Sequence, residues 1–405
     1  MILRARTVIT NTGTPIENGA VAVAKNRFVA AGGFDEIRAM HTGEVIDLGE
    51  QVLMPGLVNA HCHLDYTMMR RAINPQRSFT EWILRINALK RSLDNDDYRA
   101  AIAKGFAELK QWGTTTVANI ESFPELLPDM TPPPIRTWWF FEMIDVRHRL
   151  AGEETIAGTL SFFDQRPDWI GGFGLSPHAP YTASGKLYEL TADASEQLAM
   201  PVTTHVAESR EEWEMFRHGR GELHDFMEKL GRWMFDNQER RTPLAHIAAH
   251  ARLGPRWLLA HMNELDEPDF ALLAAMPQPP SVVHCPGSHR YFRHSPFPLK
   301  RLREIGVNVC LGTDSLASTL TLSMFDEMRI LARQEPQLDP SEILKMATLN
   351  GAKALGIEAG KIAPGSLADL IALPHADNAR EVHAAVIENR EPVAWMMLDG
   401  KILSQ

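Results

Sequence analysis

Two histidines separated by a single residue, His61 and His63, end an apolar run in the stretch MPGLVNAHCHLDYT, residues 54–67. In an extended strand, residues two apart project to the same side. The two imidazoles can therefore hold one object from one direction, and a metal ion is the obvious candidate. The pair alone does not establish a metal site, so other parts of the chain must supply the missing ligands.

Other metal-ligating and acid–base side chains also stand at the ends of apolar runs. They are His178, His205 with Glu208 three residues later, His261, His284 and Asp314. A single histidine at a strand end is more often packed and hydrogen-bonded than a ligand. Asp314 alone could be a helix N-cap, and Glu208 alone could be a solvated residue of an acidic helix. Their recurrence at successive strand ends favours one shared site.

Such a site requires strands that end at one rim. From Leu53 to about Ala363, short apolar runs alternate with stretches that are apolar at helical spacing, a pattern typical of repeated βα units. We predict eight strands, at residues 53–61, 114–120, 135–144, 171–178, 201–206, 257–262, 281–286 and 307–314. Eight such strands favour a (β/α)₈ barrel, in which the chemistry lies at the carboxyl ends of the strands.

The two ends of the chain have a different pattern, with short strands separated by turns. Strands this short form a sheet only with partners, so we expect the two ends to build one domain together. The predicted fold is therefore α/β, with a TIM barrel at residues 53–363. A small composite β-sandwich domain is expected from residues 1–52 plus 364–405.

Composition limits the classes of function. A net charge of −10 over 405 residues argues against a general nucleic-acid binder, which needs a basic surface. No apolar run reaches the roughly 18 residues of a membrane span. The N-terminus is too polar for a secretory signal, and the widely spaced Cys62, Cys285 and Cys310 fit reduced thiols. We therefore expect a cytoplasmic enzyme.

The motifs PGLVNAHCH, SPHAPYT, THVAES, LLAHMNEL, VVHCPGS and CLGTDS occur in an order that resembles the amidohydrolase superfamily. The resemblance is to its chlorohydrolase and aminohydrolase branch, which includes cytosine, guanine, S-adenosylhomocysteine and aminodeoxyfutalosine deaminases. It covers about residues 50 to 373 and implies a metal-dependent barrel with a composite β-sandwich, in agreement with the strand pattern.

The resemblance implies four metal ligands: His61, His63, His205 and Asp314. Three neutral imidazoles and a carboxylate suit one divalent ion such as Zn²⁺, and Fe²⁺ would also accept them. Superfamily members with two metals usually bridge them through a carboxylated lysine or a glutamate near the end of the fourth strand. That strand ends here in GGFGLSPHAP, with neither residue, so we expect one metal ion.

The resemblance also implies the roles of three catalytic residues. Glu208 would take a proton from the metal-activated water and pass it to a ring nitrogen. Asp314 would accept the next proton and help to release ammonia, while His261 would hold and polarise the attacking oxygen.

Several other residues are candidates for contacting the substrate, and most of them have an alternative structural role. His178 resembles a substrate-contacting histidine, and Glu142 resembles a third-strand glutamate that binds sugar or ring; the alternative for Glu142 is a buried charge paired with an arginine. Trp82 could stack on a planar ring or pack in the core. His284 could contact substrate or shape the seventh loop, and His289 stands where many relatives have asparagine.

The expected reaction is hydrolytic deamination of an amino-substituted heteroaromatic ring, such as that of a purine nucleoside or related metabolite. The enzyme would be a hydrolase acting on carbon–nitrogen bonds other than peptide bonds. An alternative is a chlorohydrolase or amidase acting on a related ring, and a third reading is a catalytically inactive barrel. The partner would be a small molecule rather than nucleic acid or membrane, and the resemblance suggests a homodimer.

Overall fold

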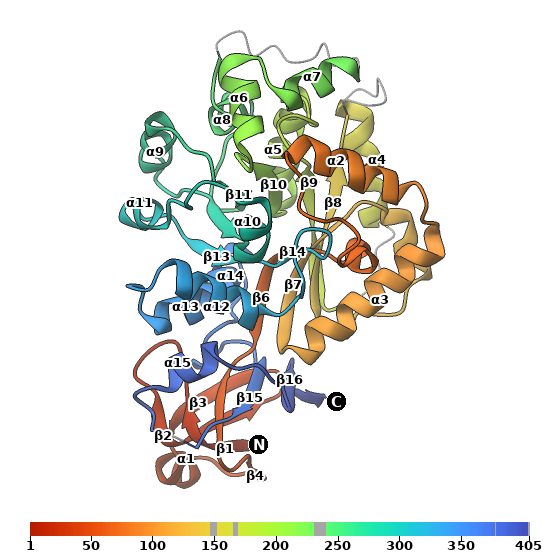
Figure 1. Cartoon of the computed structure of the whole chain (residues 1–405). Coiled ribbons are helices and arrows are strands. Elements are labelled where there is room, and N and C mark those ends of the chain that lie inside the picture. The colour runs from red at the N-terminus through yellow and green to blue at the C-terminus, as the bar shows by residue number, and fades with distance from the viewer. Residues whose placement is uncertain (146–151, 165–168, 231–239, 377, 404–405) are drawn as a thin grey trace.

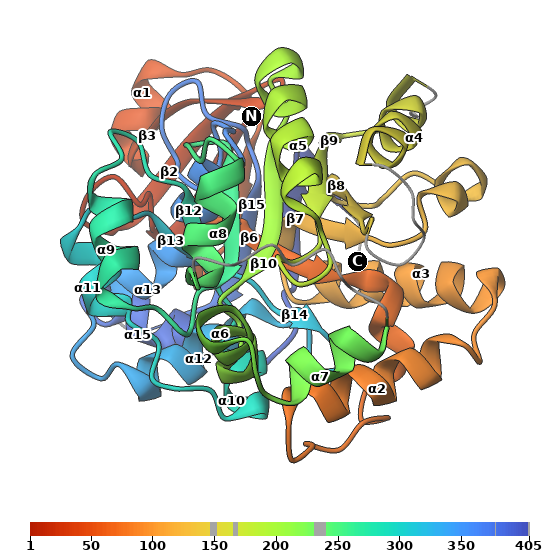
Figure 2. The ribbon, with the colours of Figure 1, turned by 90° about the horizontal axis from the view of Figure 1, so that it is seen from above.

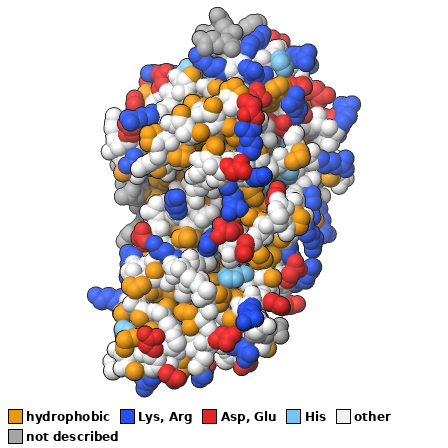
Figure 3. Space-filling model, turned by 90° about the vertical axis from the view of Figure 1, so that its left-hand side faces the viewer, with side chains coloured by type: hydrophobic (Ala, Val, Ile, Leu, Met, Phe, Trp, Pro, Cys, Tyr) orange, Lys and Arg blue, Asp and Glu red, His pale blue; other side chains and the backbone are white. Residues whose placement is uncertain are grey.

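The computed structural model describes residues 1–145, 152–164, 169–230, 240–376 and 378–403. Figure 1 shows a barrel above a smaller sheet, with both chain termini at the smaller sheet. On the face shown in Figure 3, acidic and basic side chains are interspersed. Among the described residues, no helix has the length and apolarity needed to cross a membrane.

The barrel is built from parallel strands in chain order. They are β6 (Leu57–His63), β7 (Thr114–Glu121), β8 (Arg136–Met143), β9 (Gly171–Pro177), β10 (Val202–Val206), β11 (Trp257–His261), β12 (Ser281–His284) and β13 (Val309–Leu311). The short β14 (Asp314–Ser315) pairs in parallel with β6, and the Thr313 N–H donates to the His61 carbonyl at 3.0 Å. This pairing closes the sheet, which confirms the predicted (β/α)₈ barrel.

Helices surround the barrel, as the view from above shows (Figure 2). The α-helices are α2 (Phe79–Lys90), α3 (Asn95–Gln111), α4 (Gly152–Asp164), α5 (Gly185–Leu198), α6 (Arg210–His218), α7 (Glu222–Lys229), α8 (Pro243–His250), α9 (Glu267–Ala274), α10 (Pro286–Phe292), α11 (Leu299–Glu304), α12 (Met324–Gln334), α13 (Pro340–Met346) and α14 (Leu349–Ala354). Two short 3₁₀ helices are η1 (Leu64–Met69) and η2 (Pro124–Asp129). Apolar faces of strands and helices form the main core between them.

The smaller sheet combines both ends of the chain. Its strands are β1 (Ile2–Val8), β2 (Ile16–Ala24), β3 (Arg27–Gly33), β4 (Val45–Asp47), β5 (Gln51–Pro55), β15 (Leu370–Pro374), β16 (Trp395–Leu398) and β17 (Lys401–Leu403), accompanied by α1 (Phe34–Met40) and α15 (Val382–Ile387). β5 lies between β1 and β15, so an N-terminal strand pairs directly with a C-terminal one.

The apolar run at residues 53–61 was predicted as one strand, but it forms two. β5 ends at Pro55 in the smaller sheet, and β6 begins at Leu57 in the barrel. The chain passes between the sheets at Gly56, where an added Cβ would lie 2.1 Å from a Thr115 side-chain atom. Both strands are buried, so a continuous apolar pattern gave no sign of the break. β5 straddles the predicted boundary at 52/53, and the division into 1–52 plus 364–405 and 53–363 stays a prediction.

Arg136 at the start of β8 joins the barrel to the smaller sheet. Its guanidinium donates to Asp369 at 3.2 and 3.3 Å and to Asp399 at 3.3 Å. Arg136→Met would leave the buried Asp369 carboxylate without its cation, so we expect a loss of about 3–5 kcal/mol in the free energy of unfolding. Urea-induced unfolding of the variant and the parent measures this loss of free energy. Arg301→Met is the control: it breaks an exposed pair with Glu267, and an equal loss there would contradict this role of Arg136.

Candidate active site

The predicted site residues lie together at the carboxyl ends of the barrel strands. His61 and His63 end β6, Glu142 lies near the end of β8, His178 follows β9, His205 lies in β10, Glu208 follows β10, His261 ends β11 and Asp314 begins β14. Most of their side chains are buried. Chain positions more than 250 residues apart, such as His61 and Asp314, are thus brought to one rim.

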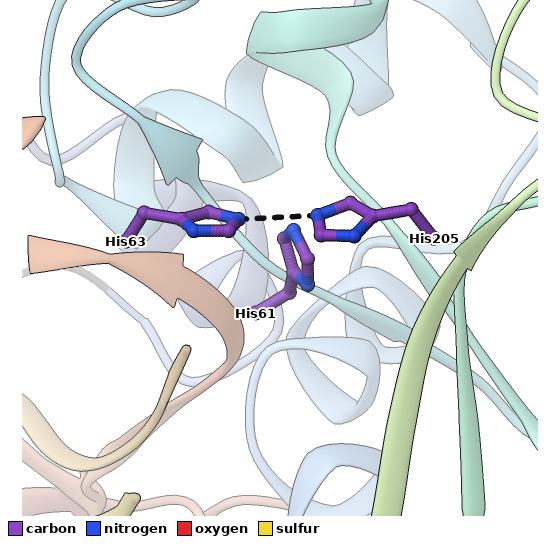
Figure 4. A group of neighbouring side chains, drawn as sticks. All are labelled: His61, His63 and His205. Carbon is purple, nitrogen blue, oxygen red and sulfur yellow. Dashed lines mark hydrogen bonds between the residues drawn. The ribbon is translucent and has the colours of Figure 1, made fainter. Parts of the chain in front are cut away.

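Three histidines form the centre of the site (Figure 4). The Nε2 atoms of His63 and His205 are 3.1 Å apart. The His61 ring stands nearly perpendicular to both, with centroid distances of 5.1 Å to His63 and 4.9 Å to His205. One ring nitrogen from each residue lies within 4.8 Å of the others. The three imidazoles therefore converge on one point from two strands.

This nitrogen cluster has the donor chemistry of a divalent metal site. His205 Nδ1 lies 2.8 Å from the His178 carbonyl oxygen, which assigns the proton to Nδ1 and leaves the Nε2 lone pair facing the cluster. Burial lowers the pKa of His205 to about 3 and the pKa of His63 well below its usual value, so both rings are neutral. Tetrahedral ligands at 2.0–2.1 Å from an ion are roughly 3.3 Å apart, close to the observed Nε2 separation.

Asp314 faces the same cluster with one oxygen and is held by the other. Its Oδ1 lies 3.7 Å from His61 Nε2 and 3.8 Å from His63 Nε2. Its Oδ2 accepts hydrogen bonds from the hydroxyls of Ser288 at 2.6 Å and Ser318 at 2.8 Å. Burial alone raises the pKa of Asp314, but the neighbouring histidines, His61 foremost, hold it well below its usual value. A carboxylate is thus available beside the imidazoles.

Glu208 and His261 form a second pair at the edge of the cluster. Glu208 Oε1 lies 3.7 Å from His261 Nε2. Burial, then the charges of Asp314 and Glu212, raise the pKa of Glu208 well above its usual value. Burial lowers the pKa of His261. A buried carboxyl group with a raised pKa, close to the histidine cluster, is suited to take up and release a proton.

A pocket opens beside this centre, and His178 and Glu142 line its polar part. His178 Nδ1 lies 2.6 Å from the Thr182 hydroxyl, and His178 Nε2 lies 3.9 Å from Glu142 Oε1. Glu142 Oε2 accepts a hydrogen bond from the Ser122 hydroxyl at 3.0 Å. Within the described part of the chain Glu142 forms no ion pair with an arginine, so the alternative of a buried arginine pair finds no support there.

Helices α2 and α7 supply much of the apolar wall of the pocket. Trp82 lies on this wall, and its indole also packs at 5.9 Å from the Phe79 ring and 5.0 Å from the Phe292 ring. Trp82 therefore both packs and lines the pocket. The other apolar side chains of the wall are Ile83, Ile86, Phe226, Met227 and Leu230, and α2 adds the polar side chains of Asn87 and Lys90.

Several residues of the site were not predicted. Lys90 was one, although it shares a helix face with Trp82 and Ile86 at a spacing of four. The serines that hold Asp314 and the α7 residues had no distinctive spacing. Conversely, His284 lies outside the pocket lining and stacks on Phe297 at 3.9 Å. His289 is bonded to the Ser295 carbonyl at 2.8 Å, so both side chains contact the segment that follows β12.

Comparison with known proteins agrees with the motifs. The sequence pattern described as "Amidohydrolase family" matches residues 52–403. The chain is 32% identical over 338 residues to 5-methylthioadenosine/S-adenosylhomocysteine deaminase of Pyrococcus furiosus, an alignment that covers 80% of this chain and 75% of that protein.

Two solved structures are similar over nearly the whole chain. A zinc-bound adenosine deaminase from Xanthomonas campestris superposes with a TM-score of 0.81 at 26% identity, covering 99% of this chain and 92% of that one. Aminofutalosine deaminase of Helicobacter pylori, in complex with methylthio-coformycin, superposes with a TM-score of 0.85 at 20% identity, and the match covers 100% of both chains. At that identity, the second likeness shows the fold alone.

Proposed function

The chain belongs to the amidohydrolase family, and we propose that it is a metal-dependent hydrolase that deaminates the adenine ring of a nucleoside or related metabolite. The observation that carries the proposal is the Glu208–His261 pair, 3.7 Å apart, beside three converging imidazoles. A scaffold protein gains nothing from burying these ionisable groups together at the mouth of a pocket. The P. furiosus relative, named as a deaminase of adenine-containing nucleosides, supports the same reaction.

We propose His61, His63, His205 and Asp314 as the ligands of one divalent ion, with Zn²⁺ favoured and Fe²⁺ the alternative. The donor set suits Zn²⁺, and the X. campestris deaminase carries zinc. A bound ion of this kind lowers the pKa of water toward 7 and so supplies the nucleophile near neutral pH.

The protein side chains then handle the protons. Glu208 accepts one proton from the attacking water and delivers it to a nitrogen of the ring, which removes the aromatic character of the attacked carbon. Asp314, oriented by Ser288 and Ser318, accepts the next proton and returns it to the amino group, which departs as ammonia. His261 holds the attacking oxygen in line with that carbon.

His178, Glu142 and Trp82 are proposed to bind the substrate from the pocket. Glu142→Gln is expected to lower kcat/KM by about 10- to 100-fold, mainly through KM, because hydrogen bonds to a charged group are worth about 1.5–3 kcal/mol. Steady-state ammonia release measures it. Glu121→Gln is the matched control, since Glu121 is a buried carboxylate on the neighbouring β7 that does not line the pocket. Equal KM values for the two variants would contradict the role of Glu142.

The proposed function is tested by a product screen on the metal-loaded protein. Candidate substrates are adenine, adenosine, 5-methylthioadenosine, S-adenosylhomocysteine, aminodeoxyfutalosine, guanine, cytosine and chlorotriazines, with ammonia, chloride and carboxylate as readouts. We expect ammonia from an adenine compound. Chloride or carboxylate as the sole product would replace deamination by the alternative chemistry, and no product at all would favour the inactive barrel.

The cytoplasmic location, the homodimer and the lack of nucleic-acid binding stay predictions.

A further inference from the structure

The turn that carries Glu208 is held by a side chain of α6, the helix that follows it. The backbone N–H groups of Ala207 and Glu208 donate to Glu212 Oε1 at 3.1 Å and Oε2 at 2.7 Å. Glu212 has no exposed surface. Both carboxylate oxygens are therefore used on the backbone immediately around Glu208.

This contact does more than cap a helix. The hydroxyl of Ser209 already accepts the Glu212 N–H at 3.1 Å and caps α6. In a capping box, the carboxylate at this position would bond the N–H of the capping residue itself. Here its two oxygens accept the N–H groups of Ala207 and Glu208, the two residues before Ser209. The Glu212 side chain thus holds the turn before α6 in addition to the helix end.

The turn that follows His261 holds the same segment from the other side. The N–H groups of Asn263 and Glu264 donate to the Ala207 carbonyl at 2.8 and 2.9 Å. The Asn263 side-chain amide donates to the Glu208 carbonyl at 2.9 Å. The two turns that carry Glu208 and His261 are therefore bonded directly to each other.

Both turns contain unfavourable backbone conformations. Ala207 has φ 51°, His261 has φ 74° and Met262 has φ 52°, values in the left-handed region that side chains other than glycine rarely adopt. Such conformations persist only where the surrounding contacts over-determine them. The hydrogen bonds that Glu212 accepts and Asn263 donates supply contacts of this kind.

We propose that Glu212 and Asn263 are positioning residues that lock the two turns together and so keep the Glu208 carboxylate opposite His261. The inference rests on the proposed function for its kinetic consequence, but the clamp itself is a property of the unliganded chain. A displacement of Glu208 by about 1 Å can cost on the order of 100-fold in rate.

Glu212→Gln and Asn263→Leu test the clamp. The amide of glutamine can accept only one of the two N–H groups, and leucine keeps the shape of asparagine but donates nothing. Each variant is expected to lower kcat by about 10- to 100-fold with KM and bound metal close to the parent values. Hydrogen exchange of the Ala207 and Glu208 amides in the metal-free protein is expected to be faster than in the parent.

Asp269→Asn is the matched control. Asp269 is also a buried carboxylate at the third position of a helix, where it accepts the Asp266 N–H at 2.8 Å. Its loss should lower stability while leaving kcat and the exchange of the 207–208 amides unchanged.

A folded, metal-loaded Glu212 or Asn263 variant with parental kcat and exchange would overturn the inference, as would an effect on KM or metal content alone. If Glu212→Gln does not fold, Asn263→Leu decides alone. A parent protein that releases no ammonia from any substrate would overturn the proposed function instead, and amide exchange would still decide the clamp.

Discussion

Glu208→Gln is expected to leave metal and substrate bound while lowering kcat by about 100- to 10 000-fold, the range for loss of a general acid–base group. The glutamine amide has nearly the size of the carboxyl group but neither accepts nor delivers a proton at the pH of the reaction. The raised pKa of Glu208, caused first by burial, makes its carboxyl group suited to both transfers. The loss should therefore appear in kcat and hardly at all in KM.

The measurement is steady-state ammonia release together with elemental analysis of bound metal. Glu214→Gln is the control, because Glu214 lies on α6, which follows the turn that carries Glu208, but pairs with Arg210 at 3.8 Å near the surface. Near-parental kcat in Glu208→Gln would remove the acid–base assignment. A large rise in KM with unchanged kcat would instead make Glu208 a substrate-binding residue.

The shared rim of the four proposed ligands could be predicted from the sequence because each of them stands at the end of an apolar run. Strand periodicity sets the side to which His61 and His63 point, and a parallel barrel brings the ends of β6, β10 and β14 to one rim. Local pattern and fold class placed His205 and Asp314 at the same rim, but the family resemblance was needed to select them from the other residues at strand ends. The family resemblance then gave each residue a role.

The supporting residues could not be predicted in the same way. Ser288 and Ser318 act on Asp314 through space, and serine is common in loops of every kind. Asn263 bonds the Glu208 carbonyl across 55 positions of the chain, a contact that depends on the relative height of two neighbouring strands. The break at Gly56 was hidden because both sheets bury the adjoining strands. Packing between elements, rather than pattern within them, decides these features.

The pocket wall formed by α2 and α7 also depends on a contact between elements that are distant in the sequence. Glu211 on α6 accepts the N–H groups of Phe79 at 2.6 Å and Thr80 at 3.1 Å, which anchors the start of α2. The turn after β10 therefore leads both to the acid–base residue and to the support of the wall that carries Trp82. Under the proposed function, the acid–base residue and part of the substrate pocket therefore depend on one short segment of the chain.

Loss of a metal ligand is expected to have an effect as large as loss of Glu208, but with a different signature. His205→Ala removes one of two Nε2 atoms that lie 3.1 Å apart. Mutation of residues that only hydrogen-bond to metal ligands costs about 10- to 100-fold in metal affinity. Loss of a ligand itself should therefore lower the affinity for the ion by more than about 100-fold. Chelation of the parent should abolish ammonia release, and added Zn²⁺ should restore it in the parent but not in the variant.

Thermal unfolding separates this effect from general damage, because an ion that binds only the folded state raises its stability. The parent Tm should rise when metal is added, whereas that of His205→Ala should not. His246→Asn is the control, since His246 is a buried histidine of α8 outside the pocket lining, and its Tm should still respond to metal. Full metal content in His205→Ala, or a chelated parent that keeps its activity, would show that the three imidazoles do not hold a catalytic ion. The proposed hydrolysis would then have no source of nucleophile.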